Sequence, residues 1–168
     1  MAKIYAITRY LTIIGAVFRG WLEQVGCRRR KIPVEDNRCL RFNEMCSHIE
    51  HEQLYDRKKA AGLCVAPFIV TAFMGIFFMA PGALMTIFVG DYSVFSLFFL
   101  WIGISLWTNM FPSMENAMYY SQLAEESGKG KILSKLMLSG AKLESTGLTL
   151  VTSVLAAYLV ASIFAMIL

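Results

Sequence analysis

The sequence predicts an all-α integral membrane protein with three transmembrane helices and an N-terminal helix that is membrane-embedded or interfacial. Hydrophobic residues make up 57% of the 168 residues and charged residues only 17%, whereas soluble domains are about a quarter charged. No charged residue occurs from Ala60 to Gly90, and about 20 apolar residues suffice to cross a bilayer. The length favours a single polytopic membrane domain over residues 1–168.

The first predicted helix covers residues 4–26 and is apolar except for three ionisable side chains, Arg9, Arg19 and Glu23. Arg19 and Glu23 are four residues apart and therefore share one helical face. Ionisable groups inside a membrane segment suggest a function. Alternatively, the helix lies at the membrane surface with Arg19 and Glu23 among the lipid headgroups. We expect this second arrangement, although the sequence alone leaves both open.

A polar segment, residues 28–59, separates this helix from the first transmembrane helix, which we place at residues 60–79. The tripeptide Ala80-Pro81-Gly82 is a turn signal. It predicts that the helix ends there and that a loop or short re-entrant segment follows as far as Tyr92.

The second and third transmembrane helices are expected at residues 93–111 and 148–168. Pro112 ends the former, and Ser113 is suited to cap a new helix, with Asn116 three residues later. The Gly128-Lys129-Gly130 tripeptide indicates a break before the last helix. The last helix carries small residues that permit close helix packing, namely Ser153, Ala156, Ala157, Ala161 and Ser162.

The basic residues indicate how the chain is oriented. With the predicted helices in place, every cluster falls on one side of the membrane, which the positive-inside rule makes cytoplasmic. We therefore expect an integral protein of the plasma membrane with cytoplasmic basic loops. The net charge of +4 does not indicate a nucleic-acid partner, and four cysteines without a Cys-x-x-Cys pair do not indicate a disulfide framework. The clusters are residues 28–31, residues 57–59, and Lys129, Lys131, Lys135 and Lys142.

The polar segment also contains the two histidines of the chain, His48 and His51. Imidazole and carboxylate groups can bind zinc, so we consider a metal site formed by His48, His51, Glu44 and Glu52, with Glu115 as a further ligand. Neither Cys-x-x-Cys nor His-Glu-x-x-His occurs. A solvated charged segment is therefore the simpler interpretation, and no catalytic or cofactor-binding residue is predicted.

Three stretches, GAVFRGWLEQVGCRRRKIPVE, CSHIEHE and WTNMFPSMENA, together resemble the layout of compact membrane metallopeptidases of the site-2 protease group. The resemblance covers most of the chain. It implies a His-Glu-x-x-His motif on an early helix and a carboxylate ligand on a later one. In this chain, residues 19–23 read Arg-Gly-Trp-Leu-Glu where the family has its His-Glu-x-x-His motif. Glu115-Asn116 stand where the family has its later carboxylate ligand. The resemblance therefore implies a relative without catalytic activity.

Three functions are compatible with these features. The first is a non-catalytic structural or interaction subunit that is held in the bilayer and contacts a protein partner or a second copy of itself. The second is a degenerate or atypical membrane metallopeptidase with zinc near His48 and His51. The third is a channel or transporter component in which Arg19, Glu23 and Asn109 face water. We expect the first, and therefore not an enzyme.

Overall fold

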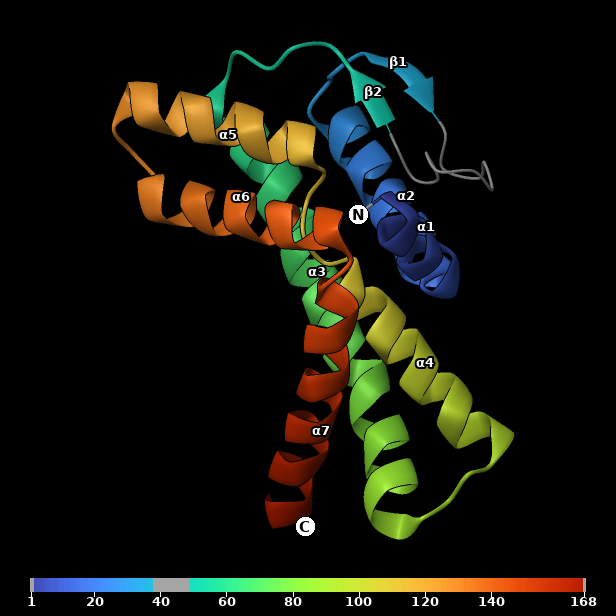
Figure 1. Cartoon of the computed structure of the whole chain (residues 1–168). Helices are drawn as coiled ribbons and strands as arrows, with labels where there is room; N and C mark the ends of the chain where they lie inside the picture. Colours follow the sequence, from blue (N-terminus) through green and yellow to red (C-terminus); the bar gives the residue numbers. More distant parts are fainter. Residues whose placement is uncertain (1, 38–48, 168) are drawn as a thin grey trace.

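The computed structural model describes residues 2–37 and 49–167, which are helical apart from one two-stranded hairpin (Figure 1). This agrees with the predicted all-α class. The elements, in chain order, are α1 (Ala2–Leu11), α2 (Ile13–Arg29), β1 (Val34–Asn37), β2 (Ile49–His51), α3 (Arg57–Ala83), the π-helix η1 (Leu84–Val89), α4 (Val94–Thr108), α5 (Met114–Ser127), α6 (Lys131–Thr146) and α7 (Thr149–Ile167).

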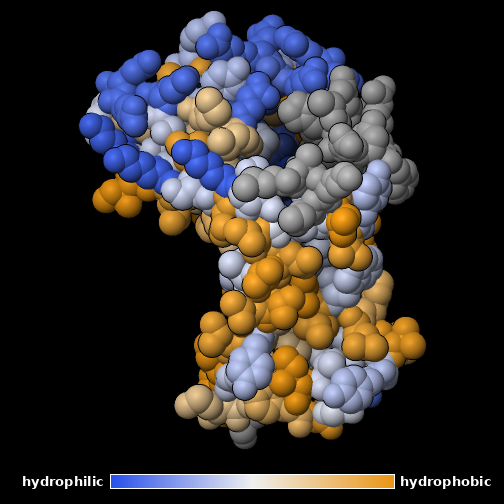
Figure 2. Space-filling view, in the orientation of Figure 1, coloured by the Kyte–Doolittle hydropathy of each residue, from blue (hydrophilic) through white to orange (hydrophobic). Residues whose placement is uncertain are grey.

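Apart from α1 and α2, which pack against α3, α4 and α6, the elements form two parts, which we name the cap and the stem. The cap consists of α5, α6 and the β1–β2 hairpin, and the stem consists of α4, α7, η1 and the half of α3 that packs against them. Helix α3 passes from one part into the other, and α5 and α6 run across the direction of α7 (Figure 1). Hydrophilic residues gather on the cap and hydrophobic residues on the stem (Figure 2). The surfaces of the two parts therefore differ in polarity (Figure 2).

Each part has its own core. The cap core joins the end of α2 and the start of α3 to α5 and α6, and it includes Leu63, Tyr120 and Met137. The stem core is smaller and joins α3 to α7 through Met79 and Ala157, with residues of α4 packed against it. Because little of the stem is buried within the chain, its outer surface is available to lipid or to a partner.

The N-terminal segment is two helices rather than the single helix predicted at residues 4–26. Thr12 separates them with non-helical backbone angles, φ −115° and ψ 34°. The indole nitrogen of Trp101 donates to the carbonyl of Leu11 at 2.9 Å, and the Thr12 hydroxyl donates to the carbonyl of Thr8 at 2.8 Å. The break therefore depends on a partner on α4 that lies far along the chain, and sequence-local signals do not show it.

The predicted end of the first transmembrane helix at residue 79 is wrong. Helix α3 continues through Pro81 to Ala83, and η1 extends the helical segment to Val89. In apolar surroundings, helical hydrogen bonds satisfy the backbone better than an open turn does, so a proline is tolerated within a membrane helix. The segment ends at Gly90, whose φ of +72° lies in the left-handed region that glycine adopts readily.

Two helical segments are long and apolar enough to cross a membrane, Arg57–Val89 and Thr149–Ile167. The third expected span is the 15-residue helix α4, which is shorter than the roughly 20 residues that a bilayer needs. A count of three transmembrane helices is therefore not confirmed. The small-residue face predicted for the last helix is present, because Ser153, Ala157 and Ala161 are buried on α7.

The loop before α4 is held by a carboxylate that accepts three hydrogen bonds. Asp91 accepts from the Ser96 hydroxyl at 2.6 Å and from the hydroxyl and amide of Ser93 at 2.9 and 3.0 Å. Ser93 in turn caps α4, at the residue where the sequence predicted the start of the second transmembrane helix. Hydrogen bonds from Ser96 and then Ser93 lower the pKa of Asp91, because they favour the ionised form.

We expect this network to make α4 sensitive to acid. A carboxyl group whose pKa is lower in the folded state stabilises the fold above its unfolded pKa of about 3.9, and this contribution disappears as the pH falls through the folded value. Carbon-13 NMR of the Asp91 carboxyl group should therefore show a titration midpoint below about 3.9. Ser96→Ala should raise that midpoint, and an unchanged midpoint in this variant would contradict the assignment.

Candidate functional site

The strongest candidate site is a group of buried charged and polar side chains where α1, α2, α4 and α6 meet. Arg9 comes from α1, Arg19 and Glu23 from α2, Asn109 from the end of α4, and Glu144 from α6. These five side chains, which we name the ion cluster, all have relative exposures of 7% or less. The ion cluster includes the three residues predicted as polar groups within the membrane, Arg19, Glu23 and Asn109.

Glu144 is the central acceptor of the ion cluster. Its Oε1 accepts from Nη1 of Arg19 at 2.5 Å and from Nη1 of Arg9 at 3.1 Å. Charge-assisted hydrogen bonds of this kind are roughly twice as strong as neutral ones. Glu144 therefore connects α6 to both α1 and α2.

Arg19 also contacts two other groups. Its Nη1 donates to the carbonyl of Phe111 at 3.2 Å, and its Nε lies 3.8 Å from Oε1 of Glu23. Burial lowers the pKa of Arg19, but the carboxylates of Glu144 and then Glu23 outweigh this effect and leave the pKa above its usual value. Arg19 is therefore a permanent buried cation.

Asn109 connects the charged groups to the helix break at Thr12. Its Oδ1 accepts from Nη1 of Arg9 at 3.2 Å. Its Nδ2 donates to the hydroxyl of Thr12 at 2.9 Å and to the carbonyl of Ser105 at 2.9 Å. The amide thus uses both its acceptor and its donor groups, and it holds the end of α4 against the N-terminal helices.

The burial of Arg19 and Glu23 corrects one expectation. The sequence suggested that these side chains reach the lipid headgroups, yet their side-chain exposures are only 4% and 2%. The interaction with Glu144, which lies 125 residues from Arg19, could not be derived from local sequence. One sequence feature pointed to Glu144 as a partner for a buried arginine: it is the only acidic residue in the lysine-containing helix α6.

The arrangement suits a structural role better than a catalytic one. Two guanidinium groups face two carboxylates, so the formal charges of the ion cluster cancel. The cavity beside it has a volume of about 10 Å³, which is about the size of one water molecule and too small for a substrate. The nearby thiol of Cys27 is buried, and burial and then Glu23 raise its pKa to about 11, so the thiolate nucleophile is scarce at neutral pH.

The residues predicted as metal ligands are only partly described. Glu44 and His48 lie outside the described residues. His51 is on β2, where its Nδ1 lies 2.8 Å from the carbonyl of Glu52 and its Nε2 lies 2.6 Å from Oδ1 of Asn116. Glu115 accepts a hydrogen bond from Tyr119 at 3.3 Å. Within residues 2–37 and 49–167, no three His, Cys, Asp or Glu side chains are close enough to hold a metal ion.

His51 therefore connects the hairpin to α5 in the described structure. The hairpin is antiparallel, and His51 pairs with Val34 across it. Helix α5 begins where the sequence predicted, with the Ser113 hydroxyl accepting from the amide of Asn116 at 3.4 Å. This N-terminal hydrogen bond of α5 places the buried Asn116 side chain against the imidazole of His51.

Asn116→Ala is expected to destabilise the cap by roughly 1–3 kcal/mol, because a buried imidazole nitrogen loses its hydrogen-bond partner. Faster amide hydrogen exchange in β2 would report the effect. Gln122→Ala is the matched control, because it removes the same amide group from an exposed position of α5. Equal exchange rates in the two variants would show that the His51–Asn116 contact contributes nothing.

Helix α6 presents an apolar strip outward. Ile132 is 89% exposed and Leu136 is 53% exposed, while Lys131, Lys135 and Lys142 are also exposed on this helix. Hydrophobic colour marks the lower edge of the α5–α6 pair, on the side of the stem (Figure 2). A helix with an apolar strip and flanking lysines is typical of the membrane interface.

Comparison with known proteins does not add a family to these observations: no protein-family model, no curated protein and no solved structure matches the chain. The class supported by the structure itself is a helical protein with two candidate membrane-spanning segments, an internally neutralised ion cluster and a polar cap.

Proposed function

We propose that this protein is a non-catalytic interaction subunit of a membrane complex. The observation that carries the proposal is the ion cluster. Its charges are used in contacts among α1, α2, α4 and α6, so they fix the cap on the stem and leave no reactive group directed at a substrate. In some proteins a buried polar network selects one conformation, and we propose this role for the ion cluster. Such a conformation suits a protein that presents a fixed surface to a partner.

The proposed location is the plasma membrane, with the cap on the cytoplasmic side. Arg57–Val89 and Thr149–Ile167 are the supporting segments. The end of α2, the start of α3 and the α5–α6 connection carry the basic clusters, and all three lie at the cap end of the molecule (Figure 1). The connection from η1 to α4, at the opposite end, contains no lysine or arginine, which agrees with the positive-inside rule.

Helix α7 offers the proposed partner surface within the membrane. One of its faces packs on the stem core, while Leu155, Tyr158 and Leu159 are each about 60% exposed. In lipid there is no hydrophobic driving force between apolar helices. Whether a helix binds a partner therefore depends on how closely the two helices pack. The partner is a different protein or a second copy of this chain.

Site-specific photo-crosslinking in native membranes tests the proposal. A photoreactive amino acid placed in turn along the exposed positions of α7 is expected to give protein adducts at positions that share one helical face, and lipid adducts at the others. The same residue at the exposed position Phe77 on α3 serves as the control. If every position gives only lipid adducts, and exposed cap positions likewise give no protein adduct, the protein acts alone and the proposal fails.

We propose that this protein, if it is related to the site-2 protease group, is a relative without catalytic activity. Metal analysis by mass spectrometry of the detergent-purified full chain, beside a His48→Ala/His51→Ala variant, tests this point. We expect no zinc that depends on the two histidines. Near-equimolar zinc that is lost in the variant would instead support the metallopeptidase function.

A further inference from the structure

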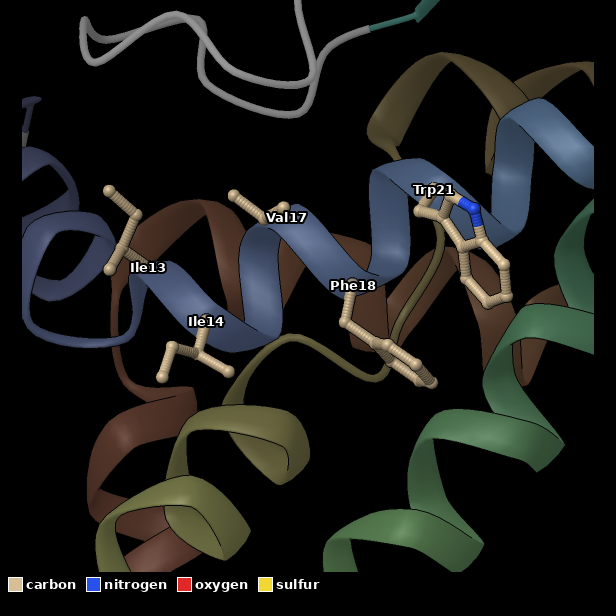
Figure 3. Close-up of a pocket in the computed structure, with 5 residues that line it drawn as sticks. All are labelled: Ile13, Ile14, Val17, Phe18 and Trp21. Atoms are coloured by element: carbon tan, nitrogen blue, oxygen red, sulfur yellow. The ribbon is translucent and has the colours of Figure 1, made fainter. Parts of the chain in front are cut away.

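Two cavities of different chemistry lie along the outer face of α2. The first has a volume of about 470 Å³, and the second, between α2 and α3, has a volume of about 360 Å³. Both are open to the surroundings rather than enclosed, and the first, lined by α2 alone, is the more open of the two. The first is lined by Ile13, Ile14, Val17, Phe18 and Trp21 (Figure 3), and the second includes Leu22, Val25, Arg29, Arg30, Pro67 and Val70.

A continuous stripe of α2 connects the two cavities. Phe18, Leu22, Val25 and Arg29 are separated by four, three and four residues, a spacing that places them on one side of a helix. Phe18 and Trp21 project to the same side of α2, toward the neighbouring ribbon of α3 (Figure 3), and their ring centroids are 5.9 Å apart. The two cavities share no lining residue, but they follow one another along α2, and we name the surface that contains both of them, apolar at its first end and cationic at its second, the α2 groove.

The positive charge at the second end is not neutralised by the described part of the chain. Within residues 2–37 and 49–167, no carboxylate forms a salt bridge with Arg29 or Arg30. The Arg30 side chain is fixed in place: its Nη1 donates to the carbonyl of Gly26 at 3.2 Å, and its guanidinium group packs over Gly62, where any larger residue would collide with it. Arg29 is exposed beside it.

The direction of the α2 groove matches the polarity of the molecule. The cationic end lies toward the hydrophilic cap end, and α2 descends from there toward the hydrophobic half (Figures 1 and 2). A ligand that fits must therefore carry a negative group at headgroup level and an apolar chain below it. Basic pockets between helices on the cytoplasmic side of a membrane are known to bind anionic headgroups.

We infer that the α2 groove is a binding site for one anionic phospholipid. The headgroup phosphate lies against Arg29 and Arg30, and one acyl chain lies along Ile14, Phe18 and Trp21. Charge complementarity selects the anionic over the zwitterionic lipid, and the apolar lining holds the chain. This inference rests on the groove and does not depend on the proposed partner.

Tryptophan quenching tests the inference, because Trp21 lies at the apolar end. Trp101→Phe and Trp107→Phe leave Trp21 as the one tryptophan in the full chain. The protein is reconstituted into phosphatidylcholine vesicles that contain a small fraction of lipid with brominated acyl chains, which quench indole fluorescence on contact. We expect brominated phosphatidylglycerol to be enriched at Trp21 roughly tenfold over brominated phosphatidylcholine at the same mole fraction.

Charge variants locate the headgroup site. Arg29→Gln/Arg30→Gln is expected to reduce quenching by brominated phosphatidylglycerol to the phosphatidylcholine level. Arg29→Gln alone is expected to reduce it in part, and because Arg29 is exposed this variant should fold normally. Lys131→Gln/Lys135→Gln is the matched control: it removes the same charge from exposed positions of α6 and should leave the quenching unchanged.

Three outcomes would overturn the inference. Equal quenching by both brominated lipids would mean that the groove contacts bulk lipid only. An equal loss in the arginine and lysine variants would mean that the general surface charge attracts the lipid. Weak quenching by either lipid would mean that protein covers the groove. If the tryptophan variant does not fold, native mass spectrometry of the unmodified protein decides the matter by comparing phosphatidylglycerol retention with that of Arg29→Gln.

Discussion

Replacing Glu144 with leucine is expected to lower the free energy of unfolding by roughly 3–5 kcal/mol, the usual cost of removing one partner from a buried ion pair. Glu144 is 6% exposed, and its carboxylate accepts hydrogen bonds from both Arg9 and Arg19. Without it, two cations stay buried and lose their shared acceptor. Glu23, 3.8 Å from Nε of Arg19, remains as the nearby carboxylate. Denaturant titration of the purified protein, followed by circular dichroism, measures the loss.

Two comparisons decide whether the loss comes from the ion cluster. Glu126→Leu makes the same substitution at an exposed position of α5 and should change the stability by less than about 0.5 kcal/mol. A double variant, Arg19→Leu/Glu144→Leu, should be more stable than the sum of the single losses predicts, because residues in one network are not additive. If Glu144→Leu is as stable as Glu126→Leu, the ion cluster does not hold the cap to the stem.

Gly103→Ala is expected to disrupt the contact between α3 and α4, at a cost of about 3 kcal/mol or more. A methyl group on Gly103 would lie 2.5 Å from the backbone nitrogen and Cα of Met79. Backbone atoms inside a helix cannot move aside as a flexible side chain can, so the two helices must separate. The Trp107 side chain packs against the same core, and a change in its fluorescence, together with a lower thermal midpoint, would report the separation.

Gly75→Ala provides the control at the same pair of helices. A methyl group there would meet its nearest neighbour, the backbone nitrogen of Trp107, at 3.3 Å, so a small adjustment suffices. Alanine also favours a helix over glycine by about 1 kcal/mol. We therefore expect Gly75→Ala to be close to neutral. Equal losses in the two variants would mean that α4 does not approach α3 as closely as the structure shows.

The Glu144 and Gly103 predictions both concern contacts between segments that are distant in sequence. Charged residues are needed where the cap meets the stem, and small residues are needed where α3 meets α4. The stem has little buried side-chain volume of its own, so it depends on close backbone approach at glycine. The junction with the cap is charged, so it depends on the pairing of Arg9 and Arg19 with Glu144. A fixed cap on a slender stem is the geometry that the proposed interaction function requires.

The sequence by itself determined the features that local chemistry controls. The charge-free stretch after Ala60 predicted a long apolar helix, Ser113 predicted the start of α5, and the spacing of Arg19 and Glu23 predicted their shared helical face. The last two signals act within about one helical turn, where hydrogen bonding and side-chain periodicity are settled by neighbouring residues. The small-residue face of α7 was also evident from the pattern alone.

Only the tertiary structure decided the rest. Thr12 breaks the N-terminal helix because Trp101 and Asn109 bind there. Pro81 does not end α3, because helical hydrogen bonding continues to Ala83 and η1 then extends the helix to Val89. The candidate site depends on Glu144 meeting Arg9 and Arg19 across more than a hundred residues. Pairing of buried charges is a property of the folded arrangement, since the cost of burial and the partners that offset it exist only once the helices have packed.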